Sequence, residues 1–142
     1  MSEQNFKNHA RYIPLWHYIT PLIIAAILGW GIVNFVDHHA FTHFLGASMI
    51  LVSIVLLLIW WYARVFAIRA QDRAIRAEEN FRHFILTGKP FDSKLSIGQI
   101  IALRFASDEE MPALAKKAVE ENLSSKQIKE AIKNWRADHH RA

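Results

Sequence analysis

The chain has 142 residues, of which 52% are hydrophobic and 21% charged, and its formal net charge is +4 at pH 7. This length leaves room for one small domain besides any membrane spans. The absence of cysteine excludes disulfide scaffolds, thiolate nucleophiles and thiolate metal sites.

Apolar and charged residues lie in separate blocks of the sequence. From Leu15 to Ala63 the only Asp, Glu, Lys or Arg is Asp37, whereas nearly all the other charges follow Ala63. A soluble fold mixes apolar and charged positions at the period of its helices or strands. The segregation therefore predicts an all-α membrane protein.

Two uninterrupted apolar stretches, residues 15–36 and 44–63, each come close to the roughly 20 residues that cross the hydrocarbon core of a bilayer. The segment DHHAFTH, residues 37–43, joins them. We predict a transmembrane helical hairpin with residues 37–43 as its loop. The alternative is a buried hairpin in a soluble protein, but too little polar chain remains to cover two helices that are apolar on every face.

Positive charge flanks only one end of each predicted span. Lys7 and Arg11 lie in the N-terminal segment, residues 1–14, and several arginines follow the second span, whereas residues 37–43 contain no Lys or Arg. Positive charge near span ends is retained on the cytoplasmic side. Both termini are therefore predicted to be cytoplasmic, and the loop external.

Small residues cluster toward the outer ends of both spans, at Gly29, Gly31, Gly46, Ala47 and Ser48. Small side chains let two helices approach closely in lipid. We expect the hairpin to be tightest there, with Asn34 able to hydrogen-bond across the helices. Binding of a second subunit by the same residues is the alternative.

The second span is predicted to continue as a cytoplasmic stalk helix, residues 64–87, which Gly88 and Pro90 end. One face is an apolar stripe at helical spacing, made of Ala70, Ala74, Ala77, Phe81 and Phe84. A basic set is expected either to bind anionic lipid headgroups or simply to be solvated: Arg64, Arg69, Arg73 and Arg76. A coiled coil is not favoured, because the heptad that Ile68 and Ile75 begin meets Arg82.

Residues 88–142 are predicted to form a compact cytoplasmic tail of about three short helices. Capping boxes of the form S-x-x-E/Q begin at Ser96, Ser107 and Ser124, although Pro112 shifts the middle helix start toward Met111. The apolar faces of these helices are expected to pack on one another and on the stalk. The first face comprises Ile97, Ile100, Ile101 and Phe105; the third comprises Ile128, Ala131, Ile132 and Trp135; the stalk contributes Phe81, Phe84 and Ile85.

Residues 110–136 also have the spacing of a helix-turn-helix, with basic residues that a DNA-reading helix needs at Lys126, Lys129, Lys133 and Arg136. Glu120, Glu121 and Glu130 lie beside them and oppose this interpretation. Membrane-tethered nucleic-acid binding is therefore the alternative function, and we expect no nucleic acid as partner.

We expect no metal site and no cofactor. Metal candidates are limited to the loop imidazoles of His38, His39 and His43, which have little room for supporting hydrogen bonds.

No catalytic constellation is recognisable, so the chain is not expected to be an enzyme. The leading hypothesis is a non-catalytic accessory, scaffold or anchoring subunit whose partners are the lipid bilayer, anionic lipids and another protein or a second copy. Its predicted contact surface comprises Arg104, Phe105, Lys133, Trp135 and Arg136. The alternative is that Phe105 and Trp135 belong to the tail core.

Several segments resemble a family of small bacterial inner-membrane proteins, mainly from Bacteroidetes, described as a domain of unknown function. They are KNHARYIP at residues 7–14, QDRAIRAEENFRHFILTGK at 71–89, IIALRFASDEE at 100–110, KAVEENLS at 117–124 and IKNWRADHHR at 132–141. The resemblance covers nearly the whole chain and implies a multi-pass protein of the bacterial cytoplasmic membrane. It brings no catalytic residues.

Overall fold

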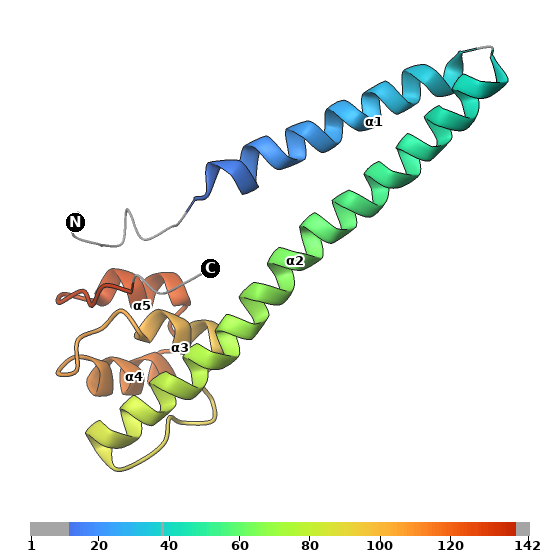
Figure 1. Cartoon of the computed structure of the whole chain (residues 1–142). Helices are drawn as coiled ribbons and strands as arrows, with labels where there is room; N and C mark the ends of the chain where they lie inside the picture. The colour runs from blue at the N-terminus through green and yellow to red at the C-terminus, as the bar shows by residue number, and fades with distance from the viewer. Residues whose placement is uncertain (1–11, 38, 139–142) are drawn as a thin grey trace. The chain divides into compact units, whose positions relative to one another are not determined.

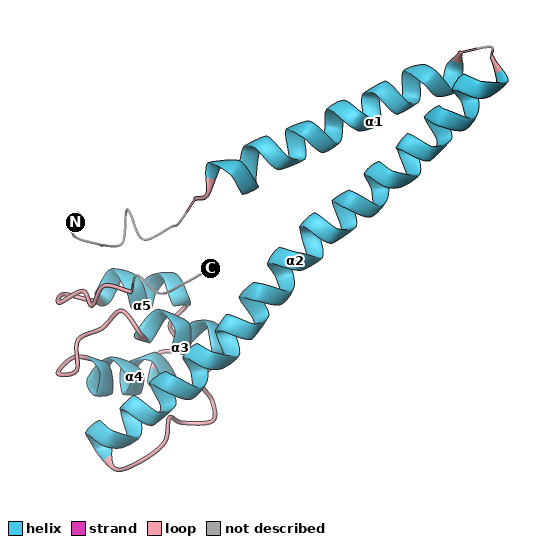
Figure 2. Ribbon diagram, viewed as in Figure 1, coloured by secondary structure: helices cyan, strands magenta, loops and turns pink. Residues whose placement is uncertain are grey.

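A computed structural model describes residues 12–37 and 39–138, which are helical throughout their regular structure and contain no named β-strand (Figures 1 and 2). The elements are, in chain order, η1 (Leu15–Ile19), α1 (Thr20–Val36), α2 (Ala40–Thr87), α3 (Ile97–Leu103), α4 (Met111–Glu120) and α5 (Ser125–Ala131). The described residues up to Ala67 form one compact unit and those from Ile68 form another, and α2 contributes to both.

Leu15–Val36 and α2 are both long and apolar enough to cross a membrane. Only 11% of the most apolar window of each is buried, whereas a core helix of a soluble protein is mostly buried. The prediction of two membrane-length helices is therefore confirmed. The second begins at Ala40, four residues before the predicted Phe44, so the connection shortens to residues 37–39.

The first turns of Leu15–Val36 form a π-helix, η1, where one continuous α-helix was expected. Pro21 lies at the start of α1 and has no N–H to donate to the carbonyl of His17, against which its ring would also clash. The chain widens instead, and both the backbone N–H and the hydroxyl of Thr20 donate to the carbonyl of Leu15.

The two helices of the hairpin approach closely at two glycines. A Cβ added at Gly46 would lie 2.4 Å from the backbone nitrogen of Phe35 and 2.7 Å from the carbonyl oxygen of Gly31. One added at Gly31 would lie 3.0 Å from Cβ of Met49. The prediction of close packing is confirmed for Gly31 and Gly46.

Gly29 does not take part in this contact, because a Cβ there would meet nothing within 4 Å. Ala47 and Ser48 are half-buried, and the Ser48 hydroxyl donates to the carbonyl of Phe44 in its own helix. The predicted cross-helix bond of Asn34 is also wrong, because its amide donates to the carbonyl of Trp30 one turn earlier. The other end of the hairpin is joined by Trp60, whose indole N–H donates to the carbonyl of Trp16 at 3.0 Å.

A hydrophobic cluster fills the tail, and all its members come from residues 91–132. The buried members are Phe91, Leu95, Ile100, Ala102, Leu103, Ala106, Met111, Leu114, Ala115, Ala118 and Ile128. Three short helices surround it, as predicted. Ile97, expected on the buried face, is 42% exposed because the α3 face that packs inward is turned toward Ile100 and Leu103.

Local capping sets the ends of the tail helices. Complete capping boxes open α3 at Ser96 with Gln99 and α5 at Ser124 with Gln127, as predicted. The middle helix begins at Met111, where Pro112 is tolerated within the first turn. It ends at Glu120, and just beyond it Asn122, with a φ of 49°, allows the N–H of Leu123 to donate to the carbonyl of Ala118 in a Schellman-type closure.

The segment after α5 is extended and not helical. The N–H of Arg136 donates to the carbonyl of Phe105 at 2.7 Å, and Ala106 and Trp135 form an isolated antiparallel bridge. The carboxylate of Glu110 accepts the backbone N–H groups of Lys133 and Asn134. These long-range bonds satisfy backbone groups that a longer α5 would have satisfied, so the predicted helical face through Ile132 and Trp135 is wrong.

Candidate functional site: the tail docked on the long helix

The tail docks on one face of the C-terminal part of α2. Ile75 and Glu79, one turn apart on this face, are each 7% exposed, and the side chain of Arg82 is 13% exposed. A carboxylate and a guanidinium are rarely buried to this extent unless they are paired. The docking face is therefore mainly polar, with Ile75 as its apolar contact.

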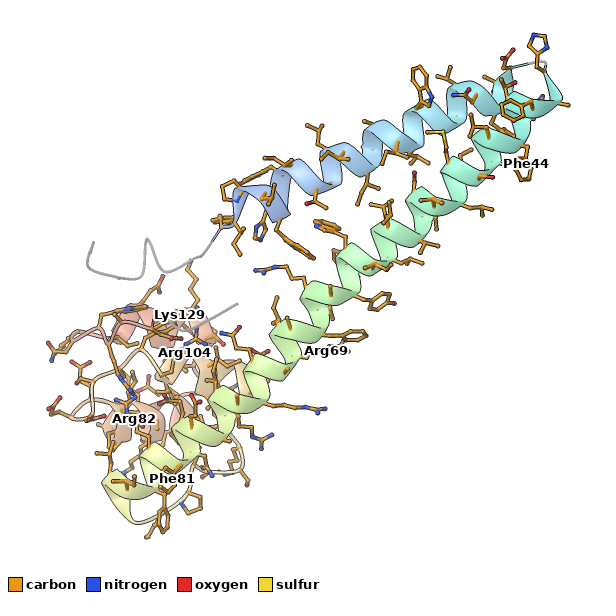
Figure 3. The ribbon with its side chains drawn as sticks, viewed as in Figure 1. Phe44, Arg69, Phe81, Arg82, Arg104 and Lys129 are labelled. Atoms are coloured by element: carbon orange, nitrogen blue, oxygen red, sulfur yellow. The ribbon has the colours of Figure 1, made fainter. Side chains whose placement is uncertain are left out.

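Arg82 joins α2 to the tail through several charge-assisted bonds. Its guanidinium donates to Asp108 at 2.7 and 2.6 Å, to the carbonyl oxygen of Ala106 at 2.8 Å, and to Glu79 at 2.9 Å. Figure 3 shows Arg82 directed into the tail, whereas Phe81 points away from it. Because the planar guanidinium has donors along two edges, one residue can hold both the carboxylate and the backbone of the loop after α3.

The loop after α2 is fixed by two further residues of the helix. The side-chain oxygen of Asn80 accepts the N–H of Phe91 at 2.9 Å. The ring of His83 stacks on that of Phe91 with centroids 4.3 Å apart, and its Nδ1 lies 2.8 Å from the carbonyl oxygen of Lys89. Gly88, with φ of 73°, makes the reversal that this arrangement needs.

The predicted packing of the tail on Phe81, Phe84 and Ile85 is wrong, because these side chains are 65%, 50% and 66% exposed. The docking residues Glu79, Arg82 and Asp108 were missed by the sequence analysis. Glu79 and Arg82 are three residues apart on one helix, which is a recognisable pair spacing, but the position of Asp108 depends on the tertiary fold.

The predicted partner surface is largely interior. Phe105 is fully buried and stacks on Trp135 with ring centroids 4.6 Å apart. Arg104 is 9% exposed, lies 4.4 Å from the centroid of the Phe105 ring, and pairs with Asp138 at 3.0 Å. Only Lys133 and Arg136 are exposed, so the alternative interpretation, that these aromatic residues belong to the core, is correct for Phe105.

The helix-turn-helix arrangement is not formed as predicted. α5 has 7 residues and ends at Ala131, so Lys133 and Arg136 lie on the extended segment after it. Lys126 pairs with Glu130 at 3.8 Å, and Nζ of Lys129 lies 5.7 Å from the centroid of the Phe105 ring. The four basic residues therefore do not line one helix.

The predicted lipid-binding arginines lie along α2 outside the docking face. Arg69, Arg73 and Arg76 are exposed, Arg64 is half-buried, and none of them forms an ion pair with another described residue. Exposed guanidinium groups of this kind remain available to anionic ligands, and their contact with lipid stays a prediction.

The loop histidines form no metal site within the described residues, where no group of three His, Asp or Glu side chains gathers. The ring of His43 instead packs edge-on against Phe35, with centroids 5.6 Å apart. His39 is exposed, and His38 lies outside the described residues.

A cleft opens where the end of α2, the loop after it and α4 meet. Its volume is about 490 Å³, within the range of ligand-binding clefts. Its walls include His83, Phe91 and Leu95 on one side and Ala115 and Val119 on the other. Lys116 and Glu120, which pair at 3.8 Å, also line it. The cleft offers apolar walls and two charges of each sign, because Lys89 and Asp92 line it as well.

These features define an all-helical protein that has two helices of membrane length and a helical tail docked on the second. The chain belongs to the family of unknown function DUF6526, whose model matches residues 1–142. The resemblance to a domain of unknown function is thereby confirmed. No curated protein and no solved structure matches the chain.

Proposed function

We propose that the chain is a two-span protein of the bacterial inner membrane that acts as a non-catalytic scaffold, holding a partner protein at the cytoplasmic surface. The observation that carries this proposal is the continuity of α2, which runs from Ala40 to Thr87. The apolar part of this helix supplies a span, and its last turns carry the tail through Arg82. A tail attached in this way would be tethered to the membrane.

Membrane insertion is supported by the exposure of the apolar helices. In water, unburied helices of this composition would be strongly unfavourable, since each buried leucine-sized side chain is worth roughly 1.5–3 kcal/mol. The orientation rests on the clustering of arginines after Ala63 and on the absence of Lys and Arg from residues 37–43. In that orientation, Arg64, Arg69, Arg73 and Arg76 follow the second span and are placed to attract anionic headgroups.

The partner is proposed to bind in the cleft beside α4. The stacking of Phe91 on His83 and the burial of Leu95 give this cleft fixed walls, as a specific protein contact requires. Lys116 and Glu120 supply charges that can orient the partner. The surface that the sequence suggested around Phe105 is unsuitable because it is buried.

Cysteine labelling tests membrane insertion and orientation, since the natural chain has no cysteine. Ala40→Cys, at the start of α2, should react with a membrane-impermeant maleimide in intact cells. Ser93→Cys, in the tail loop, should react only after permeabilisation. Labelling of Ser93→Cys in intact cells would refute the orientation, and recovery of the chain in the soluble fraction would refute insertion.

Exchange of the charges of the Lys116–Glu120 pair in the cleft tests the scaffold role. The full chain would be extracted from native membranes with detergent, and co-eluting proteins would be identified by mass spectrometry. A stoichiometric partner should be lost from Lys116→Glu/Glu120→Lys but kept by Lys126→Glu/Glu130→Lys, which exchanges an equivalent pair, also 3.8 Å apart, on α5. Absence of any stoichiometric partner, or equal loss from both variants, would contradict the proposal.

A further inference from the structure

The stalk part of α2 has an apolar stripe that the tail leaves uncovered. Its members are Ala70, Ala74, Ala77, Phe81 and Phe84, all of them exposed. Phe81 and Phe84 are 65% and 50% exposed, and Ile85 beside them is 66% exposed. Large apolar side chains gathered on one face are typical of a contact with another surface.

The spacing along this stripe is that of a coiled-coil seam. Its members alternate by four and three residues, which places Ala74 and Phe81 at a positions and Ala70, Ala77 and Phe84 at d positions of a heptad. In the sequence the same alternation continues back through Ala67 to Ala63.

The structure removes the reason for which a coiled coil was not favoured from the sequence. The heptad that failed at Arg82 began with Ile68 and Ile75. Ile75 and Arg82 face the tail, where they are largely buried, and fall at b positions when the seam is placed on Ala74, Ala77 and Phe81. The tail therefore occupies the side of α2 away from the seam, and a second helix can approach the seam without displacing it.

We propose that two copies of this chain associate through a parallel coiled coil between the stalks of their α2 helices. Alanines at a and d let the helix backbones approach closely over the first heptads, and Phe81 and Phe84 interlock at the end. The parallel direction rests on the membrane insertion proposed above, since two copies with the same topology in one membrane place their stalks side by side in the same direction.

Charge complementarity also favours a second copy of the chain as the partner of this seam. In a parallel coiled coil, a residue at g faces the e residue five positions later on the partner helix. Arg73 lies at g and Glu78 lies five positions later at e, so two copies form two equivalent Arg–Glu pairs. Both side chains are exposed, and neither forms an ion pair with another described residue.

Lipid is a less suitable occupant for the end of the seam. Phe84 lies 21 residues after Ala63, the last residue of the predicted second span, which is about 32 Å along an α-helix. The headgroup region on one side of a bilayer is only about 5–8 Å thick.

Disulfide cross-linking of the full chain in its native membrane tests the seam. Ala70→Cys and Ala77→Cys should each give roughly tenfold more covalent dimer on mild oxidation than their neighbours Arg69→Cys and Arg76→Cys, because only the seam positions bring two Cα atoms within disulfide range. Cross-linking at Ala70 also requires the parallel direction, because an antiparallel pair centred near Ala77 separates the two Ala70 residues. Equal cross-linking at all four positions, or none, would overturn the proposal.

Charge exchange gives a second readout in the Ala77→Cys background. Arg73→Glu or Glu78→Arg alone should lower the dimer fraction roughly two- to fivefold, and Arg73→Glu/Glu78→Arg together should restore it. Failure of the double variant to recover would overturn the pairing.

Two more measurements separate the possible failures. Soluble-fraction recovery or inverted labelling of the cysteine variants above would remove the premise of parallel alignment, independently of the seam. A bimane label on Phe84→Cys that is quenched by spin-labelled lipid, together with absent cross-linking, would identify the bilayer as the occupant and overturn the coiled coil.

Discussion

The two compact units of the chain are held together by different kinds of contact. In the unit that ends at Ala67, the helices approach where side chains are missing, at Gly31 and Gly46. In the unit that begins at Ile68, a hydrophobic cluster forms the interior and Arg82 attaches it to α2 through charge-assisted bonds. The comparison shows one helix, α2, using two modes of packing along its length.

The difference follows from the solvent that each unit is expected to meet. Lipid tails are as apolar as leucine, so burying leucine against leucine in a bilayer gains little, and close backbone approach becomes the main source of attraction. In water, burial of apolar surface is favourable by roughly 25 cal/mol per Å², so the apolar side chains of the tail form a cluster of their own. Because these side chains are used within the tail, its contact with α2 is made mainly by polar groups.

The largest expected effect comes from breaking the polar junction. Arg82→Ala should lower the free energy that holds the tail on α2 by about 3 kcal/mol, because Glu79 would be left buried with its main partner removed. Hydrogen exchange of the full chain in lipid nanodiscs should then show faster exchange in α3 and α4. Arg76→Ala, which removes an exposed arginine from the same helix, is the control and should change little.

Unchanged protection in Arg82→Ala would show that the cluster of residues 91–132 is stable without docking. That outcome would also show that a core of this size does not depend on α2 for its stability.

The addition of one methyl group should weaken the packing between the two helices of the hairpin. Gly46→Ala places a methyl group against the backbone of Phe35 and Gly31, where no rotamer change can relieve the clash, and should cost about 2 kcal/mol through overpacking. Gly29→Ala has open space and should be neutral or slightly stabilising. Hydrogen exchange of α1 in nanodiscs reports whether the packing has loosened, and energy transfer between dyes on α1 and α2 measures the distance between the helices.

If Gly29→Ala loosened the hairpin as much as Gly46→Ala, then the close contact at Gly46 would not be the interaction that holds the two helices together. The small-residue clusters would then act through another surface, such as the second subunit that the sequence left as an alternative.

Sequence reasoning succeeded where the structure is decided locally. The capping boxes at Ser96 and Ser124, the helix end at Gly88 and the two apolar helices each depend on residues a few positions apart. The start of α4 near Met111 also followed from the local effect of Pro112.

Sequence reasoning failed where residues far apart in the chain determine the structure. On α2 the stripe through Phe81 and Phe84 is more apolar than the face of Ile75 and Glu79, so hydrophobicity alone selects the wrong docking face. The correct face depends on Arg82 meeting Asp108, 26 residues later.

The end of α5 shows the same limitation. Ile132 and Trp135 continue the helical spacing of Ile128, but the carboxylate of Glu110 binds the backbone of Lys133 and Asn134 and ends the helix. The burial of Phe105 follows, because the extended segment returns Trp135 onto it.

The smallest effects should come from the caps, and they sharpen the contrast between the units. α3 and α5 have only 7 residues each, too few to be stable alone, whereas α1 has 17 and starts without a side-chain cap. Ser96→Ala should therefore destabilise α3 by about 1 kcal/mol, since the N–H of Gln99 loses its side-chain acceptor and keeps only the carbonyl of residue 96. Ser93→Ala, in the exposed turn before it, is the control and should have no effect on α3 exchange. Equal exchange in the two variants would mean that tertiary packing, and not the cap, fixes the start of this helix.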